Sequence, residues 1–235
     1  MVLPWDKDFL SSEAELSSKT ILYASEGQNV NNVSRSIVKK ILGNIDSKDY
    51  SNLPLEEIAS QNFIFLYPKE KSVIDIDQIR DSFKYLFLKS NSKRLLYLEN
   101  IERIGTRTFN TLLKFSEEAD KNMIICMSTN NINIVPKTIL SRFQKLKIPK
   151  PSNEIIKQHL INLGLNFDEQ KNDFVLQNLT LLAEDEDKNI NELFLKFDEY
   201  EAKKEITTKD KEEIRLFLDY QIHKIKFNML KLKSN

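Results

Sequence analysis

Five short apolar runs alternate with helical patterns over the first 150 residues of this chain. The runs cover residues 21–25, 63–67, 94–98, 123–127 and 145–148. Between them, apolar residues recur every three or four positions, as Val33, Ile37 and Ile41 do, which is the spacing of one helix face. Strands that alternate with helices favour a parallel sheet with helices on both faces. The sequence therefore predicts an α/β fold built on a five-stranded parallel sheet.

The strand signals end at Pro151, and only helical patterns follow. Ser152 is a candidate N-cap for the first of these helices. From about Thr208 one long helix is predicted, and its stripe consists of Ile214, Phe217, Leu218, Gln221, Ile222 and Ile225. We expect an α/β domain over 1–150, a small all-helical domain over 151–205 and a single C-terminal helix over 206–235. A lone helix has no remaining domain in this chain to pack on, so we expect its stripe to pack on a partner protein. The lysines beyond Asp219 are interpreted as a solvated face.

Composition limits the possible functions. Lys+Arg and Asp+Glu both number 35, so the net charge is zero, and independent binding of nucleic acid through a strong basic field is not expected. The single cysteine, Cys126, lies in an apolar run and is expected to be a core residue in a reducing compartment. One cysteine and two histidines exclude a cysteine-based zinc site, and no bound metal is predicted. No apolar segment reaches 18 residues and no signal peptide is visible, so we expect a cytoplasmic protein.

The slot between the first predicted strand and the first helix is where a phosphate-binding P-loop would lie. Such a loop reads GxxxxGK[ST]; its lysine meets the terminal phosphates and its Ser/Thr holds Mg²⁺. Aligned on the helix that follows, Val30 takes the lysine position and Asn31 the Ser/Thr position. We interpret this slot as a degenerate P-loop, represented by Ala24, Gly27, Asn29, Val30 and Asn31. The alternative is a working loop that uses Lys19 or Lys39 instead.

The strand at 94–98 is followed by Glu99 and Asn100. In nucleotide hydrolases the corresponding strand ends in an Asp that holds the metal, followed by a catalytic Glu. Glu99 takes the metal position and Asn100 replaces the base, so we interpret the pair as a degenerate Walker B motif. The alternative is that Glu99 is an ordinary strand-end carboxylate, and the missing P-loop lysine favours it. The chain has the pattern of a nucleotide-binding fold that no longer binds nucleotide.

Residues 123–151 carry two further candidate sites. The strand at 123–127 ends in Ser128-Thr129-Asn130, which places polar groups at the carboxyl edge of the sheet, where α/β folds bind ligands. Thr129 and Asn130 are either a vestigial sensor 1 or a simple strand-end turn. Ser141-Arg142-Phe143 lies on a predicted short helix before the last strand. An arginine fixed there is suited to grip phosphate, and the alternative for Arg142 is a plain surface ion pair.

Four ordered motifs resemble the delta-prime subunits of the bacterial DNA polymerase III clamp loader, which are AAA+ proteins. The motifs are Pro4-Trp5 followed by Phe9, the segment 72–80 (SVIDIDQIR), the segment 110–118 (NTLLKFSEE), and Ser141-Arg142 with Pro149 and Pro151. Phe143 stands where many members have cysteine. The resemblance covers residues 1–150; it is weak over 151–205 and very weak beyond.

This resemblance implies an AAA+ domain, a helical lid and a C-terminal collar that holds a five-subunit ring. It also implies a subunit with no ATP hydrolysis of its own. Ser141 and Arg142 would reach ATP and Mg²⁺ on a neighbouring gamma/tau subunit, with Arg142 as an arginine finger in trans. The implied partners are the gamma/tau and delta subunits, and the sliding clamp and primer-template DNA through the assembled complex.

The chain departs from the family pattern at three places. The zinc knuckle of the gamma/tau relatives is absent between Leu42 and Asn62, a single helix represents the collar, and Lys188 is a poor match to the nucleotide-sensing arginine of the lid. Two other functions therefore stay open. One is an active gamma/tau-type ATPase, which would need a phosphate-binding lysine. The other is an AAA+-derived scaffold with no role at an ATP site.

Overall fold

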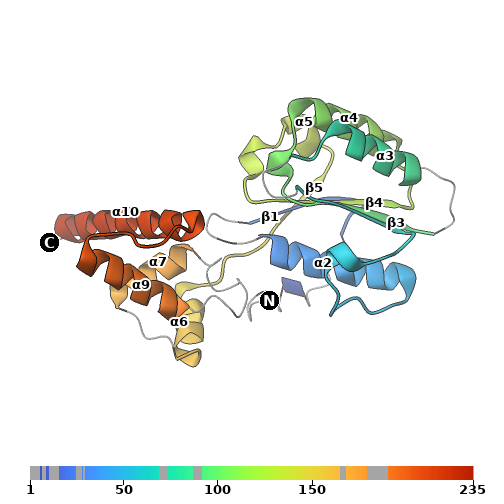
Figure 1. Cartoon of the computed structure of the whole chain (residues 1–235). Coiled ribbons are helices and arrows are strands. Elements are labelled where there is room, and N and C mark those ends of the chain that lie inside the picture. The colour runs from blue at the N-terminus through green and yellow to red at the C-terminus, as the bar shows by residue number, and fades with distance from the viewer. Residues whose placement is uncertain are drawn as a thin grey trace. The chain divides into compact units, whose positions relative to one another are not determined.

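The computed structural model describes residues 6, 9–10, 16–24, 28, 30–68, 73–86, 92–164, 168–178 and 190–234. They belong to two compact units that divide between Lys150 and Pro151. The N-terminal unit is α/β and the C-terminal unit is all-helical among its described residues (Figure 1). Pro4, Trp5 and Lys188, which the sequence analysis singled out, lie outside the described residues.

The N-terminal unit contains the predicted five-stranded sheet. Its strands are β1 (Lys19–Tyr23), β2 (Phe63–Leu66), β3 (Arg94–Leu98), β4 (Met123–Thr129) and β5 (Gln144–Lys147). They lie in the order β2-β3-β4-β1-β5, and every neighbouring pair is parallel. Because parallel strands end at the same edge, β1, β3 and β4 all deliver the residues that follow them to one side of the sheet. The predicted fold class is confirmed.

Helices cover both faces of this sheet. They are α2 (Val30–Asp46), α3 (Ile76–Leu86), α4 (Thr106–Glu118) and the short α5 (Lys137–Leu140), with 3₁₀ turns at Leu55–Glu57, Ile101–Arg103 and Ile132–Ile134. Figure 1 shows α3, α4 and α5 on one face and α2 on the other. Strand β3 explains the need for both layers, because all five of its residues are buried. Its Leu96 and Leu98 pack into the core under α3 and α4, while Leu95 and Tyr97 pack into the core under α2.

The C-terminal unit consists of α6 (Asn153–Asn162), α7 (Glu169–Gln177), α9 (Ile190–Lys203) and α10 (Lys211–Ser234). The predicted N-cap of α6 is confirmed, since the Ser152 hydroxyl accepts a hydrogen bond from the Ile155 N–H. Aromatic rings from α7, α9 and α10 form the core of the unit. They belong to Phe174, Phe194, Phe197, Tyr200, Phe217 and Tyr220, and neighbouring ring centroids lie 5.2–6.3 Å apart.

Helix α10 corrects one sequence-based expectation. It was expected to lack a partner within the chain, but its Phe217 and Tyr220 are buried against α7 and α9. Lys224, assigned above to a solvated face, donates to both carboxylate oxygens of Glu201 on α9, at 2.7 and 2.9 Å. The expectation failed because the rings of α7 and α9 cover the stripe at Phe217, while Ile225 of the same stripe stays exposed. The helix is part of the helical unit.

None of the helices among the described residues is long and apolar enough to cross a membrane.

Candidate functional site

The predicted nucleotide positions that the structure describes lie together at the carboxyl edge of the sheet. Helix α2 begins there with Val30 and Asn31, β3 delivers Glu99 and Asn100, and β4 ends at Thr129. Ala24 follows β1 and is buried. Gly27 and Asn29 of the degenerate P-loop lie outside the described residues. The tertiary structure thus places the P-loop, Walker B and sensor 1 positions in one site.

The first turn of α2 forms hydrogen bonds with the residues that end β3 and β4. Val30 is fully buried, and its backbone N–H donates to the Asn130 side-chain oxygen at 3.3 Å. The Asn31 amide donates to the Asn100 side-chain oxygen at 3.0 Å and accepts from the Ser128 hydroxyl at 3.3 Å. In a working P-loop these two positions face phosphate and Mg²⁺. Here they link α2 to the ends of β3 and β4.

Glu99 is neutralised by an arginine from α2. The carboxylate is buried, and the Arg35 guanidinium donates to it in a bidentate arrangement, from Nε at 2.5 Å and from Nη2 at 2.8 Å. Arg35 also lies 3.0 Å from the Glu56 carboxylate. The hydrogen bond to Glu99 raises the pKa of Arg35 above its ordinary value. Glu99 is therefore a carboxylate at the end of β3 that is held in an ion pair with Arg35 of α2.

The hydroxyl of Tyr97 on β3 joins α2 to the ends of β3 and β4. It lies 2.7 Å from the Ser34 hydroxyl, 2.9 Å from the Ser128 hydroxyl and 3.4 Å from a Glu99 oxygen. Tyr97 is fully buried, and burial together with the Glu99 charge raises the pKa of its phenol well above the ordinary value. The phenol stays protonated at neutral pH and keeps a donor inside the network.

A second carboxylate binds the sensor 1 positions. Glu102, in the turn after β3, accepts from the Thr129 hydroxyl at 2.9 Å and from the Asn130 amide at 3.5 Å. The turn itself starts from Asn100, whose φ of 55° is left-handed, a conformation that Asn tolerates better than most residues. This geometry presents the Asn100 side chain to Asn31.

A disguised P-loop built on Lys19 or Lys39 finds no support in the structure. Lys19 begins β1 and so lies at the opposite end of that strand from the carboxyl edge. The Lys39 ammonium donates to the Ser51 carbonyl at 3.3 Å, beyond the middle of α2. Among the described residues, no group of three or more His, Cys, Asp or Glu is placed to hold a metal ion.

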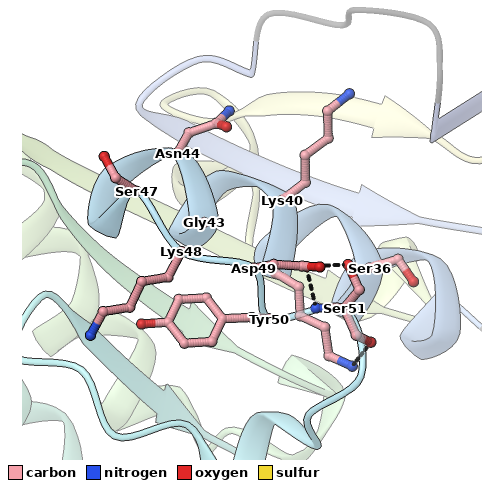
Figure 2. A pocket seen from close by; sticks show the side chains of 10 residues that line it. Ser36, Lys40, Gly43, Asn44, Ser47, Lys48, Asp49, Tyr50 and Ser51 are labelled. Atoms are coloured by element: carbon pink, nitrogen blue, oxygen red, sulfur yellow. Dashed lines mark hydrogen bonds between the residues drawn. The ribbon is translucent and has the colours of Figure 1, made fainter.

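A surface pocket of about 590 Å³ lies along the second half of α2 and the segment 47–51 (Figure 2). Its lining includes Lys39, Lys40, Lys48 and Asp49. Figure 2 shows the Lys40 and Lys48 side chains pointing in different directions, and Lys39 is occupied with Ser51. The ammonium groups do not converge on one point, so the pocket is a poor anion site. The candidate site remains the carboxyl edge.

Arg142 lies on the surface next to α5. Its side chain is 44% exposed; Nε donates to the Glu117 carboxylate of α4 at 2.7 Å, and Nη1 donates to the Thr138 carbonyl at 3.1 Å. Among the described residues, Nη2 has no partner. The Ser141 hydroxyl donates to the same Thr138 carbonyl at 3.0 Å, so it supports the turn that carries Arg142. Phe143 is buried in the core beneath α4 and α5.

Comparison with known proteins identifies the family. A family model described as DNA polymerase III, delta subunit, matches residues 11–152, which is more than half of the chain. The chain belongs to this family. The predicted resemblance to clamp-loader AAA+ proteins is therefore confirmed, and the chain is a relative of the gamma and delta-prime type of clamp-loader subunit.

Curated relatives match this chain over short stretches, and the match spans about a quarter of their length. DNA polymerase III subunit gamma of Buchnera aphidicola subsp. Baizongia pistaciae is 31% identical over 105 residues, which is 43% of this chain and 28% of that protein. The gamma subunit of Buchnera aphidicola subsp. Schizaphis graminum is 32% identical over 102 residues, 42% of this chain and 28% of that one. The uncharacterized MG007 homolog of Mycoplasma pneumoniae is 37% identical over 62 residues, 26% of this chain and 24% of that protein. Among solved structures, a gamma subunit-related protein from Thermotoga maritima aligns at 18% identity and a TM-score of 0.47, over 91% of this chain and 75% of the other.

Three residues of the candidate site were missed by the sequence analysis: Arg35, Tyr97 and Glu102. Arg35 comes one helical turn after Asn31, and that spacing places both on one face of α2. This signal was available, because a charged residue next to a degenerate P-loop position is a candidate for the same site. Tyr97 and Glu102 left no such signal, since their partners come from distant parts of the chain.

Proposed function

We propose that the chain is a non-catalytic subunit of the DNA polymerase III clamp loader, of the delta-prime kind. It binds no nucleotide of its own and supplies Arg142 as an arginine finger to ATP and Mg²⁺ on a neighbouring gamma/tau subunit. Its other partners are the delta subunit and, through the assembled complex, the sliding clamp and primer-template DNA. The observation that carries the proposal is a contrast: the side chains at the carboxyl edge of the sheet bond to one another, whereas Arg142 stays exposed.

The hydrogen bonds among the side chains at the carboxyl edge support the proposal that this chain binds no nucleotide. A triphosphate there would meet no lysine at the Val30 position and would approach the carboxylate of Glu102. Mg²⁺ would have to displace Arg35 from Glu99, and each buried hydrogen bond lost without replacement costs about 1–3 kcal/mol. The unfavourable charge at the phosphate position and the cost of displacing Arg35 both oppose the binding of Mg-ATP.

The surroundings of Arg142 support a role in trans. The Thr138 carbonyl and Glu117 hold the guanidinium at the surface, which limits the conformational entropy lost on reaching a phosphate. An arginine finger stabilises charge on the transferring phosphoryl group, an effect of about 10³–10⁵ in rate in GTPases. In a ring the measured loss is smaller, because other ATP sites take their arginines from other subunits.

The Arg142–Glu117 ion pair favours a second candidate function. An exposed pair of this kind is the alternative considered from the sequence, and it suits a scaffold that has no role at an ATP site. The two functions differ in what happens when Arg142 is removed.

Calorimetric titration with Mg-ATP tests the nucleotide part of the proposal. The isolated chain should give no measurable heat of binding. A micromolar dissociation constant would refute the proposal and restore the active ATPase as the leading function.

A reconstituted complex with clamp and primed DNA tests the arginine finger. Arg142→Ala should assemble normally yet slow steady-state ATP hydrolysis and clamp loading. Arg142→Lys should be nearly as slow, because an ammonium lacks the planar fork of a guanidinium. The matched control is Arg80→Ala, which removes another exposed arginine held in an ion pair, with Asp77. Wild-type loading by Arg142→Ala would leave only the scaffold function.

A further inference from the structure

The carboxylate of Glu117 is bonded to the proposed arginine finger. Its Oε1 accepts from the Arg142 Nε at 2.7 Å. The Arg142 Nη1 donates to the Thr138 carbonyl at 3.1 Å and to the Ser141 hydroxyl at 3.4 Å. The chain therefore holds the guanidinium through Nε and Nη1, whereas Nη2 bonds to none of the described residues.

Glu117 stands on a firmly packed part of α4. The Phe115 ring, two residues earlier, stacks on Phe83 of α3 with the ring centroids 4.5 Å apart. Ser116 is fully buried, and its hydroxyl donates to the Leu113 carbonyl at 2.8 Å. Packing thus fixes the backbone at position 117, although the Glu117 side chain is 52% exposed. A group on a fixed backbone can keep a partner side chain in one orientation.

The helix itself does not call for a carboxylate at position 117. Helix α4 ends at Glu118, and a negative charge in the last turn of a helix is unfavourable because the partial charge there is also negative. Glu118 is a second exposed carboxylate of this turn, and it forms no ion pair with any residue that the structure describes. What distinguishes Glu117 is its bond to Arg142. A comparison of the two carboxylates therefore separates the effect of the bond from the effect of charge at the helix end.

The bonding pattern favours holding Arg142 over blocking it. A carboxylate that blocked the finger would occupy the far end of the guanidinium, whereas Glu117 bonds Nε, the nitrogen attached to the side-chain stem. A phosphate oxygen can bind Nη2 without breaking that bond. The carboxylate also repels a phosphate, but the two side chains are 44% and 52% exposed, so water and salt screen the repulsion.

We propose that Glu117 is a positioning residue for Arg142: it holds Nε so that Nη2 stays available to a phosphate oxygen on a neighbouring subunit. Without this bond, the long arginine side chain would lose more rotamer freedom on reaching the phosphate. The inference rests on the proposed function. It gives the Arg142–Glu117 pair a meaning opposite to that in a scaffold, because the pair prepares Arg142 for a reaction.

Steady-state ATP hydrolysis by the reconstituted complex, with clamp and primed DNA, tests the inference. Glu117→Ala should lower the maximal rate by about half or more of what Arg142→Ala removes. The ATP concentration at half-maximal rate should not change, because the neighbouring subunit binds the ATP. Glu117→Gln keeps an oxygen that accepts from Nε and should recover most of the lost rate. The matched control is Glu118→Ala, which removes the neighbouring carboxylate and should hydrolyse ATP as the wild type does.

The double variant Glu117→Ala/Arg142→Ala separates positioning from any other effect of Glu117. If Glu117 acts only through Arg142, the double variant is no slower than Arg142→Ala alone. A further loss of rate in the double variant would contradict the inference, because Glu117 would then act on something other than Arg142.

NMR of the isolated full-length chain gives a readout that does not involve ATP. The Arg142 Nε–H signal is identified by its absence in Arg142→Lys. Its order parameter should fall to the flexible range, below about 0.6, in Glu117→Ala and should keep the wild-type value in Glu118→Ala. An Nε order parameter that Glu117→Ala leaves unchanged would overturn the inference.

Two kinetic results would also overturn it. One is wild-type hydrolysis by Glu117→Ala in a complex that Arg142→Ala slows. The other is faster hydrolysis by Glu117→Ala, which would mean that the carboxylate competes with the phosphate. Both results leave the arginine finger in place. If Arg142→Ala itself hydrolyses ATP and loads clamps at the wild-type rate, the proposed function fails and this inference fails with it, so the two failures are distinguishable.

Discussion

Arg35 provides the positive charge that Glu99 needs at the end of β3. In a hydrolase this position of the sheet would hold Mg²⁺, and the ion would leave with the nucleotide. Here the guanidinium is part of the chain, and its bidentate bonds tie α2 to β3. These bonds hold the carboxyl edge of the sheet together, so single residues at this edge have a structural role.

Removing Arg35 should therefore destabilise the N-terminal unit. Arg35→Met leaves the Glu99 carboxylate buried without a cation, and breaking such a pair costs about 3–5 kcal/mol when both partners are buried. Because the Arg35 side chain is 32% exposed, we expect a loss nearer the lower end of this range. Urea unfolding at pH 7 measures it.

The double variant Arg35→Met/Glu99→Gln is the control for this prediction. It removes both charges, so it should be more stable than Arg35→Met alone at pH 7. If the single and double variants unfold at the same urea concentration, the ion pair contributes nothing and the edge is held by the Tyr97 and Asn31 hydrogen bonds.

At the scale of elements, the end of α2 depends on a close backbone approach. The chain turns back after the helix through Ser47, whose φ is 54°, and the Lys48 N–H donates to the Gly43 carbonyl at 3.1 Å. A Cβ added at Gly43 would lie 2.7 Å from the Lys48 carbonyl oxygen. The segment 47–51 can fold against α2 because residue 43 has no side chain.

Gly43→Ala should destabilise the chain although alanine favours helices by about 1 kcal/mol over glycine. The clash is with backbone, so relief requires a shift of the turn, and we expect a net loss of about 1–3 kcal/mol in thermal or urea unfolding. Gly105→Ala is the control, because a Cβ at Gly105 meets nothing within 4 Å. A more stable Gly43→Ala variant would show that the turn moves without cost.

At the scale of the whole molecule, each of the two units has its own core. The α/β unit packs aliphatic and aromatic residues on both faces of its sheet, and the helical unit packs aromatic rings from α7, α9 and α10. Separate cores allow the stability of one unit to change while the other keeps its own.

Phe197→Ala should loosen the helical unit alone. Phe197 is fully buried between Phe194, Phe217 and Tyr220, and truncating such a ring costs about 3–5 kcal/mol. Hydrogen exchange followed by mass spectrometry should show faster exchange in α9 and α10 and unchanged exchange in β3 and β4. Equal acceleration in both units would mean that they unfold as one cooperative body.

The sequence by itself determined the features that depend on neighbouring residues. Periods of two and of 3.6 residues predicted the strands and the helices, and the absence of a lysine at Val30, where a P-loop would have one, is read from the sequence alone. The same approach predicted the five-stranded parallel sheet, the N-cap at Ser152 and the clamp-loader family. Each of these features depends on residues that are close together in the sequence.

The tertiary structure alone decided the features that join distant residues. Arg35 and Glu99 are 64 positions apart, and Tyr97 and Ser128 are 31 apart, so their bonds leave no periodic signal in the chain. Helix α10 shows the same limit: its sequence predicts an apolar stripe, but which residues of the stripe are buried depends on where the rings of α7 and α9 lie. Periodicity describes one element at a time, whereas burial is set by every element that packs against it.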